Sequence, residues 1–77
     1  MANRTEAEES KFQSYYDKMD LYQATMIAEG ADEAEDELQL LAAWQKLVNT
    51  GICWQLQGWF GRTARDLIEE GLIERAQ

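Results

Sequence analysis

The chain has 77 residues, with 15 acidic and 7 basic side chains, a net charge of −8, and neither histidine nor proline. A chain this short forms one domain with a small core. Without histidine it lacks the commonest catalytic base and the commonest metal ligand, so we expect a protein that is not an enzyme and that holds no metal and no cofactor. The negative charge opposes binding to nucleic acid and to anionic membranes, because both present phosphates.

The beginning of the chain and its one cysteine bear on where the protein is found. Residues 1–6 are mostly polar, unlike a signal peptide, and no apolar run reaches 18 residues, so we expect the protein to stay in the cytoplasm where it is made. Cys53 lies between Ile52 and Trp54 and has no other cysteine to pair with. This predicts a buried, unreactive thiol in a reducing compartment.

The first half of the chain carries a helical pattern of large apolar side chains. They recur at alternating spacings of three and four residues: Phe12, Tyr15, Met19, Tyr22 and Met26. This periodicity predicts one α-helix over residues 10–30, with Ser10 or Thr5 as its N-cap and Gly30 as its left-handed end. Residues 1–9 are expected to form a frayed acidic N-terminus.

A second amphipathic helix is expected to begin at an N-cap on Asp32 and to end at Gly51. Its apolar side chains are Leu38, Leu41, Trp44, Leu47 and Val48. The chain has no proline to interrupt either helix, so two long helices joined by a turn at residues 30–31 should lie antiparallel as a hairpin. We expect residues 10–77 to fold as a single helical domain.

Glycines divide the C-terminal third into short segments. We predict a short helix over residues 52–57, a loop over 58–61, and a last short helix with Thr63 as its N-cap and Gly71 as its end. No segment shows the alternation of apolar and polar residues that is typical of a β-strand. The predicted fold class is all-α: an antiparallel hairpin of two long amphipathic helices, capped by two short C-terminal helices. One interpretation of the aromatic residues here is that Trp54 and Phe60, with Leu56, fill the end of the bundle.

The apolar stripe of the first helix is rich in tyrosine and methionine, which are enriched at protein interfaces. One interpretation is that the stripe packs against the second helix. The other is that it forms a homo-dimer. The self-association surface would then consist of Phe12, Tyr15, Met19, Tyr22 and Met26.

Six carboxylates fall within nine residues at the predicted turn: Glu29, Asp32, Glu33, Glu35, Asp36 and Glu37. A calcium loop beginning at Asp32 fails, since it would place Glu37 where glycine is needed and Ala43 where a bidentate glutamate is needed. Two interpretations remain: a solvated start of the second helix, or an acidic face that binds a basic site on a partner protein. Residues 1–38 carry the whole net charge of −8, which favours separate roles for the two halves of the chain.

The other candidate surface is aromatic and basic, and consists of Trp59, Phe60, Arg62 and Arg65. Glycines at positions 58 and 61 would let the chain turn sharply and present both aromatic rings. Each arginine has an acid four residues later, Asp66 or Glu69. The arginines therefore either pair locally or join the aromatic rings in a contact patch for a partner.

One segment resembles a known family. The run Trp54-Gln55-Leu56-Gln57-Gly58 is followed by aromatic residues and then by Gly61-Arg62-Thr63-Ala64. With its flanks over residues 44–73, this segment resembles a family of small tailed-bacteriophage proteins to which no activity is assigned. The resemblance implies a phage origin and, with it, the cytoplasm of the host bacterium. It implies nothing about a reaction.

The sequence thus favours a small acidic phage accessory protein that binds a host or phage protein and inhibits or redirects it by occluding a basic surface, such as one that binds nucleic acid. The alternative is a structural accessory of the virion or of its morphogenesis that acts as a homo-oligomer. Direct contact with DNA is not expected, because Arg62 and Arg65 are too few basic side chains against the net charge of −8.

Overall fold

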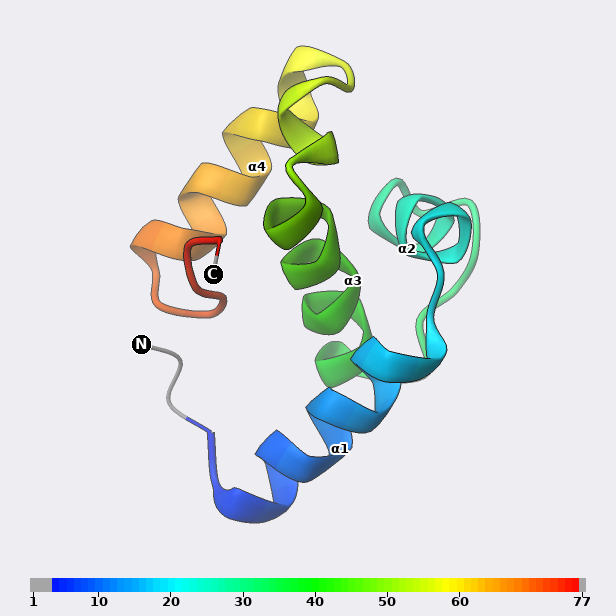
Figure 1. Cartoon of the computed structure of the whole chain (residues 1–77), viewed down its shortest axis with the longest axis vertical. Helices are drawn as coiled ribbons and strands as arrows, with labels where there is room; N and C mark the ends of the chain where they lie inside the picture. The colour runs from blue at the N-terminus through cyan, green and yellow to red at the C-terminus, as the bar shows by residue number, and fades with distance from the viewer. Residues whose placement is uncertain (1–3, 77) are drawn as a thin grey trace.

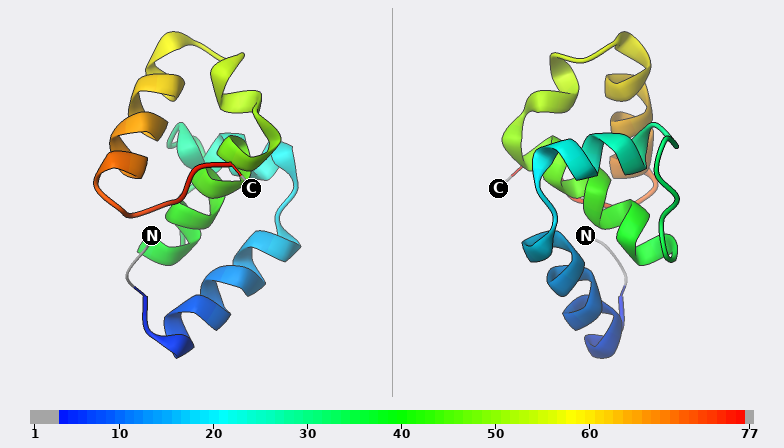
Figure 2. Two further views of the ribbon diagram at one scale, coloured as in Figure 1. Left: turned by 60° about the vertical axis from the view of Figure 1, so that its left-hand side comes forward. Right: turned by 90° about the vertical axis from the view of Figure 1, so that its right-hand side faces the viewer.

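The computed structural model describes residues 4–76, which form a small set of packed helices (Figure 1). In chain order the elements are α1 (Glu6–Lys18), α2 (Leu21–Ala28), α3 (Glu37–Thr50), the 3-10 helix η1 (Ile52–Trp54) and α4 (Gly58–Glu69). α1 and α2 both pack against α3, and α4 lies on the side of α3 away from α2 (Figure 2). The described residues contain no strand, which confirms the all-α class.

The first predicted helix is broken in two at Met19 and Asp20. Met19 has an extended backbone (φ −94°, ψ 133°), and the Asp20 carboxylate accepts a hydrogen bond from the backbone N–H of Gln23 at 2.7 Å. Aspartate favours an N-cap because its side chain competes with the helix for backbone N–H groups. Lys46 Nζ donates to the carbonyl of Met19 at 2.6 Å, at the end of α1. The single helix predicted over residues 10–30 is therefore wrong, and two shorter helices pack separately against α3 in place of one arm of a hairpin.

The break also divides the apolar stripe predicted on the first helix. Phe12 and Met19 are buried in the core, at 5% and 4% exposed, and Tyr15 is half-buried. Met26 is half-buried on α2, whereas Tyr22 is 74% exposed. The five side chains do not form one surface, and Phe12 and Met19 lie too deep to join a self-association face.

α1 begins at Glu6, four residues earlier than the predicted helix. Thr5 and Glu8 form a capping box: the Thr5 hydroxyl accepts from the backbone N–H of Glu8 at 3.1 Å, and the Glu8 carboxylate accepts from the backbone N–H of Thr5 at 2.9 Å. Residues 6–9, expected to fray, are the first turn of the helix, while residues 1–3 lie outside the described residues.

Arg4 connects this end of α1 to the C-terminal part of the chain. Its guanidinium donates to the carbonyl of Leu72 at 2.9 Å, pairs with the Glu9 carboxylate at 3.1 Å and lies 3.6 Å from the centre of the Phe12 ring. Only 9% of the Arg4 side chain is exposed. The two ends of the described chain are therefore held close together.

α3 carries most of the core and starts after an N-cap at Asp36, not at Asp32. The Asp36 carboxylate accepts from the backbone N–H of Gln39 at 3.0 Å, and residues 29–36 form a loop between α2 and α3. The buried side chains of α3 are Leu41, Ala42, Ala43, Trp44, Gln45, Leu47 and Val48. The helix ends at Gly51, whose φ of 78° is the left-handed C-cap that the sequence predicts.

We expect Gly51→Ala to lower the free energy of unfolding by about 1 kcal/mol, because an L-residue is strained at this φ even though no atom lies within 4 Å of the added Cβ. Gly30 is a matched site, with a φ of 83° and equally open space, and Gly30→Ala should have a similar effect. Urea titration followed by circular dichroism measures both changes. A change smaller than about 0.3 kcal/mol at both sites would contradict the left-handed caps.

The C-terminal segment differs most from the sequence-based expectation. Residues 52–54 form a 3-10 helix, and residues 58–61, predicted as a loop, are the first turn of α4. Thr63 therefore lies inside the helix and is not its N-cap. Packing overrides the low helix propensity of the two glycines, because the first turn of α4 buries its aromatic rings against Trp44. Gly71, at φ 78°, follows the end of α4 as predicted.

Three aromatic rings fill the space between α3 and α4. The Trp59 and Phe60 rings stack with their centres 4.0 Å apart, and the centre of the Trp44 ring lies 6.2 Å and 5.8 Å from theirs. Trp54, expected in the core, is instead 53% exposed. Its ring lies against Gly61, where an added Cβ would meet it at 3.3 Å.

Candidate functional site

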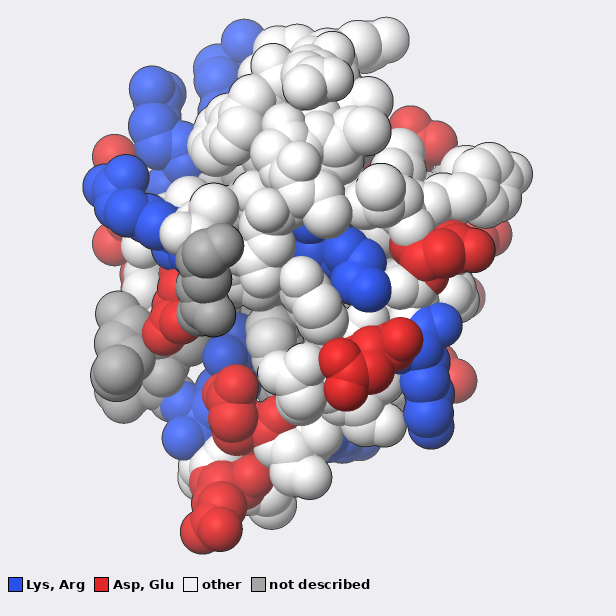
Figure 3. Space-filling view, viewed as in Figure 1, with Lys and Arg blue, Asp and Glu red and all other residues white. Residues whose placement is uncertain are grey.

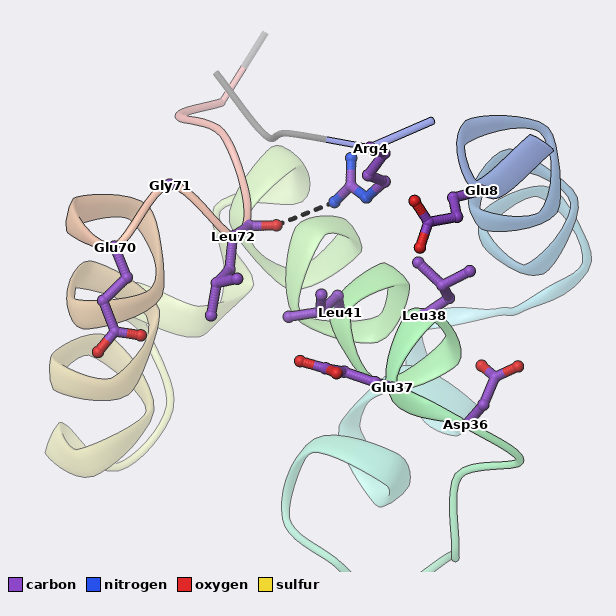
Figure 4. A pocket seen from close by; sticks show the side chains of 9 residues that line it. All are labelled: Arg4, Glu8, Asp36, Glu37, Leu38, Leu41, Glu70, Gly71 and Leu72. Atoms are coloured by element: carbon purple, nitrogen blue, oxygen red, sulfur yellow. Dashed lines mark hydrogen bonds between the residues drawn. The ribbon is translucent and has the colours of Figure 1, made fainter. Parts of the chain in front are cut away.

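A groove of about 390 Å³ opens where the start of α1, the start of α3 and the turn after α4 meet (Figure 4). Three leucines form its apolar floor: Leu38, Leu41 and Leu72. Its charged lining consists of Arg4, which pairs with Glu9 outside the groove, and of four carboxylates: Glu8, Asp36, Glu37 and Glu70. The groove therefore combines apolar surface with negative charge, a composition that suits a basic and amphipathic ligand.

The floor of the groove is built by α3 and by the chain reversal at Gly71. Leu38 and Leu41 lie three residues apart on one face of α3, where Leu41 is 7% exposed and Leu38 is half-buried. The φ of 78° at Gly71 turns the chain so that the N–H of Leu72 donates to a carbonyl of α4 at 3.0 Å. The Arg4 guanidinium donates to the carbonyl of Leu72. Both backbone polar groups of Leu72 are therefore hydrogen-bonded, which fixes the turn.

Two of the four carboxylates already have partners. Glu8 belongs to the capping box, and the N–H of Thr5 lowers the pKa of this glutamate. Asp36 pairs with Lys11 Nζ at 2.8 Å and accepts from the Tyr15 hydroxyl at 3.0 Å. The hydrogen bond from the Lys11 ammonium is the main reason that the pKa of Asp36 lies below its usual value. Both groups are ionised and fixed in place at neutral pH.

The other two carboxylates, Glu37 and Glu70, are free. Both residues are exposed, and neither side chain has an ion pair or a hydrogen bond within residues 4–76. Figure 4 shows the Glu37 carboxylate extending from the start of α3 toward the α4 side of the groove. Glu70 is the C-cap of α4. A cationic side chain over the leucine floor could pair with Glu37 or with Glu70.

The ion pair of Asp36 and Lys11 predicts that stability depends on pH. The folded pKa of Asp36 lies below its ordinary value of 3.8, so the pair stabilises the fold fully above pH 3.8, and this contribution is lost as the pH falls through the folded pKa. Asp36→Asn keeps an N-cap side chain but removes the charge. In urea titrations, the free energy of unfolding should fall more steeply below about pH 4 in the wild-type protein than in this variant. Parallel slopes would contradict the stabilising ion pair.

The acidic face predicted from the sequence is gathered on the loop between α2 and α3, residues 29–36, which we call the acidic loop. Its exposed carboxylates are Glu29, Asp32, Glu33 and Glu35. Glu35 also accepts from the Tyr15 hydroxyl at 3.3 Å. Of the six predicted acids, only Asp36 and Glu37 line the groove.

Sequence reasoning missed the other side of the groove. Glu70 and Leu72 are far from Glu37 along the chain, and the packing of the C-terminal turn brings them together. Gly71 signals the end of a helix, but no local pattern says which surface that end will meet. The contribution of Glu8 was missed because this part of the chain was expected to fray.

The predicted aromatic and basic patch does not form as one surface. Phe60 is 4% exposed and belongs to the core, and Trp59 is half-buried and packs against it. Arg62 and Arg65 are exposed on α4, and neither forms an ion pair within the described part of the chain. Trp54 is the exposed ring that lies beside Arg65. Figure 3 shows several basic side chains gathered on the α4 side of the molecule.

Cys53, predicted to be buried, is fully buried, and burial raises the pKa of its thiol.

Among residues 4–76, no three histidine, cysteine, aspartate or glutamate side chains are grouped so that they could hold a metal ion. None of the helices in that range has the length and the apolar character needed to cross a membrane.

Comparison with known proteins gives one match. Residues 24–77 match the model of the family DUF7417, which is described as a domain of unknown function. The matched range contains the acidic loop, α3, α4 and the C-terminal turn, whereas α1, with Glu8, precedes it. No curated protein and no solved structure matches the chain. Because the match spans more than half of the sequence, this chain belongs to the DUF7417 family.

Proposed function

We propose that this protein is a small binding protein that captures a basic segment of a partner protein in the acidic groove and thereby occludes the partner's basic surface. It acts by binding and not as an enzyme. The observation that carries the proposal is the pair of exposed, unpaired carboxylates, Glu37 and Glu70, beside a floor of leucines. The net charge of −8 also favours a basic partner.

The composition of the groove suits the side chains of a basic amphipathic segment. Lysine and arginine combine an aliphatic stem with a cationic head. The stem, or an apolar neighbour, would lie on the three leucines while the head reaches Glu37 or Glu70. A hydrogen bond between two charged groups is roughly twice as strong as one between neutral groups, so these contacts would determine how long the partner stays bound.

The acidic loop extends the negative surface beyond the groove. The loop is fixed at its two ends, since Gly30 closes α2 and Asp36 both caps α3 and pairs with Lys11. Exposed charges raise the rate of encounter with an oppositely charged protein more than they raise the final affinity. The loop therefore steers the partner, and the groove holds it.

The resemblance of residues 44–73 to tailed-phage proteins supports a partner in the cytoplasm of an infected bacterium, either a host protein or a phage protein. A surface that binds nucleic acid is basic, because it must neutralise phosphates. An acidic protein bound to such a surface would block it, and the partner would be inhibited or redirected to another task.

Capture from a bacterial lysate tests the proposal. The wild-type protein is immobilised beside the groove variant Glu37→Gln/Glu70→Gln, which removes both free charges. The control variant Glu6→Gln/Asp17→Asn removes two exposed charges of α1 that do not line the groove. Retained proteins are identified by mass spectrometry.

We expect a protein with a basic surface to be retained by the wild-type protein and by the control variant, and to be lost from the groove variant. Circular dichroism should first show that all three proteins have the same helix content. Equal retention by all three would show that the groove is not the binding site.

A further inference from the structure

A second surface, which shares no lining residue with the acidic groove, has the opposite charge. Around Trp54 lies a smaller groove of about 250 Å³. Its lining residues include Val48, Trp54, Arg65, Ile68, Glu69 and Arg75, and we call them the Trp54 face. Trp54 is 53% exposed, which is a large apolar area to leave in water. An exposed tryptophan between arginines is the composition typical of the energetic centre of a protein interface.

The arginines of the Trp54 face are free to bind. Arg65 and Arg75 are both exposed, and the structure gives neither of them an ion pair or a side-chain hydrogen bond within the described range. Glu69 lies four residues after Arg65 on α4, yet the two do not pair. The face therefore keeps a positive charge on a molecule whose net charge is −8.

The complementary charges lie on another side of the same molecule. The acidic loop follows α2, and Figures 1 and 2 show α2 and α4 on opposite sides of α3. The loop carboxylates of Glu29, Asp32 and Glu33 are exposed and have no ion pair among the described residues. One copy cannot cover its own Trp54 face with its own loop. A second copy can, and a solution of this protein holds loops and faces in equal number.

We propose that copies of this chain associate head to tail, with the acidic loop of one copy seated on the Trp54 face of the next. Arg65 and Arg75 pair with loop carboxylates, and the Trp54 ring packs on the loop beside the small side chain of Ala31, which is exposed. The contact is heterologous, so an open chain of any number of copies still offers one free loop at one end and one free face at the other. This inference does not depend on the partner of the acidic groove.

Two variants, each defective at one end, test the proposal. Asp32→Asn/Glu33→Gln neutralises the loop and leaves the Trp54 face intact. Arg65→Gln/Arg75→Gln neutralises the face and leaves the loop intact. Neutral replacements are needed because charge reversals at both ends would create new complementary pairs. Glu6→Gln/Asp17→Asn again serves as the control, and circular dichroism verifies the helix content of every variant.

Sedimentation velocity is measured at low salt and at protein concentrations up to about 100 μM, which covers the dissociation constants expected of a small, polar interface. The mean mass of the wild-type protein and of the control should rise with concentration beyond that of a dimer. Each end variant alone should stay monomeric. An equimolar mixture of the two should form a dimer and nothing larger, because one intact loop and one intact face remain.

Several outcomes would overturn the head-to-tail contact. A wild-type protein that stays monomeric over the whole range has no such contact. A wild-type protein that stops at a dimer uses a symmetric interface. End variants that associate like the wild-type protein, or a mixture that stays monomeric, would show that the loop and the Trp54 face do not meet.

Discussion

Trp44→Ala should remove a large part of the stability of the fold. Trp44 is 4% exposed and its ring contacts those of Trp59 and Phe60 between α3 and α4. Truncating a buried tryptophan lowers the free energy of unfolding by about 3 to 5 kcal/mol, because the lost burial and the cavity add together. A chain of this length has a total of only about 4 to 12 kcal/mol. Urea titration followed by far-ultraviolet circular dichroism measures the loss.

Trp54→Ala is the matched control, since it removes the same side chain from an exposed position. We expect it to lower the free energy of unfolding by less than about 1 kcal/mol, the range of most surface substitutions. If the two variants were equally stable, the aromatic cluster between α3 and α4 would not be the centre of the core.

The second large effect concerns the kinetics of partner binding. Asp32→Lys/Glu33→Lys should slow association with the captured partner by about one to three orders of magnitude at low salt, because the acidic loop steers the encounter. The loss should be smaller at high salt, where exposed charges are screened within roughly 8 to 10 Å or less. Glu37→Gln/Glu70→Gln should mainly speed dissociation, by about ten- to a hundredfold, because it removes charged contacts made in the complex.

Surface plasmon resonance at two salt concentrations separates these effects, and the same α1 control serves as reference. Association that is insensitive to both salt and charge reversal would mean that the acidic loop is only a solvated start of α3. Trp59→Ala, which the sequence alone suggests as a contact variant, is unsuitable here because the Trp59 ring stacks on Phe60 in the core.

Local chemistry predicted several features of the fold correctly. Helix ends at Gly30, Gly51 and Gly71 could be read from the sequence, because only glycine adopts a positive φ without strain. The capping box at Thr5 was one of two predicted starts for the first helix, and it is the one that forms. These features depend on neighbours in the sequence and not on the rest of the fold.

Features that depend on distant contacts could not be predicted in this way. The apolar spacing continues unchanged through Met19 and Asp20, while the break is stabilised by Lys46, a residue of another helix. The first turn of α4 contains glycines and forms because its aromatic rings pack on Trp44. The same packing half-buries Trp59, a candidate contact residue. It leaves Trp54, which was expected in the core, exposed.

Of the candidate site, the sequence predicts only that its charge is negative. Six acids at the turn indicated a negative surface, and two of them do line the groove. The leucine floor could not be foreseen, because Leu38 and Leu41 were assigned to the core of a hairpin and Leu72 joins them through the turn at Gly71. The sequence offers Arg65 as part of a basic contact patch with Trp59 as one candidate for its aromatic ring, whereas the exposed ring beside Arg65 is Trp54.

Binding of a basic segment in the groove is tested most directly by NMR of the leucine and valine methyl groups. The probe is a synthetic amphipathic helix with arginine and leucine at helical spacing. We predict that adding this peptide shifts the methyl resonances of Leu38, Leu41 and Leu72 more than those of other residues. These shifts should disappear in the groove variant Glu37→Gln/Glu70→Gln and remain in the control variant Glu6→Gln/Asp17→Asn. Shifts at Val48 beneath Trp54, with the three groove leucines unmoved, would contradict the account.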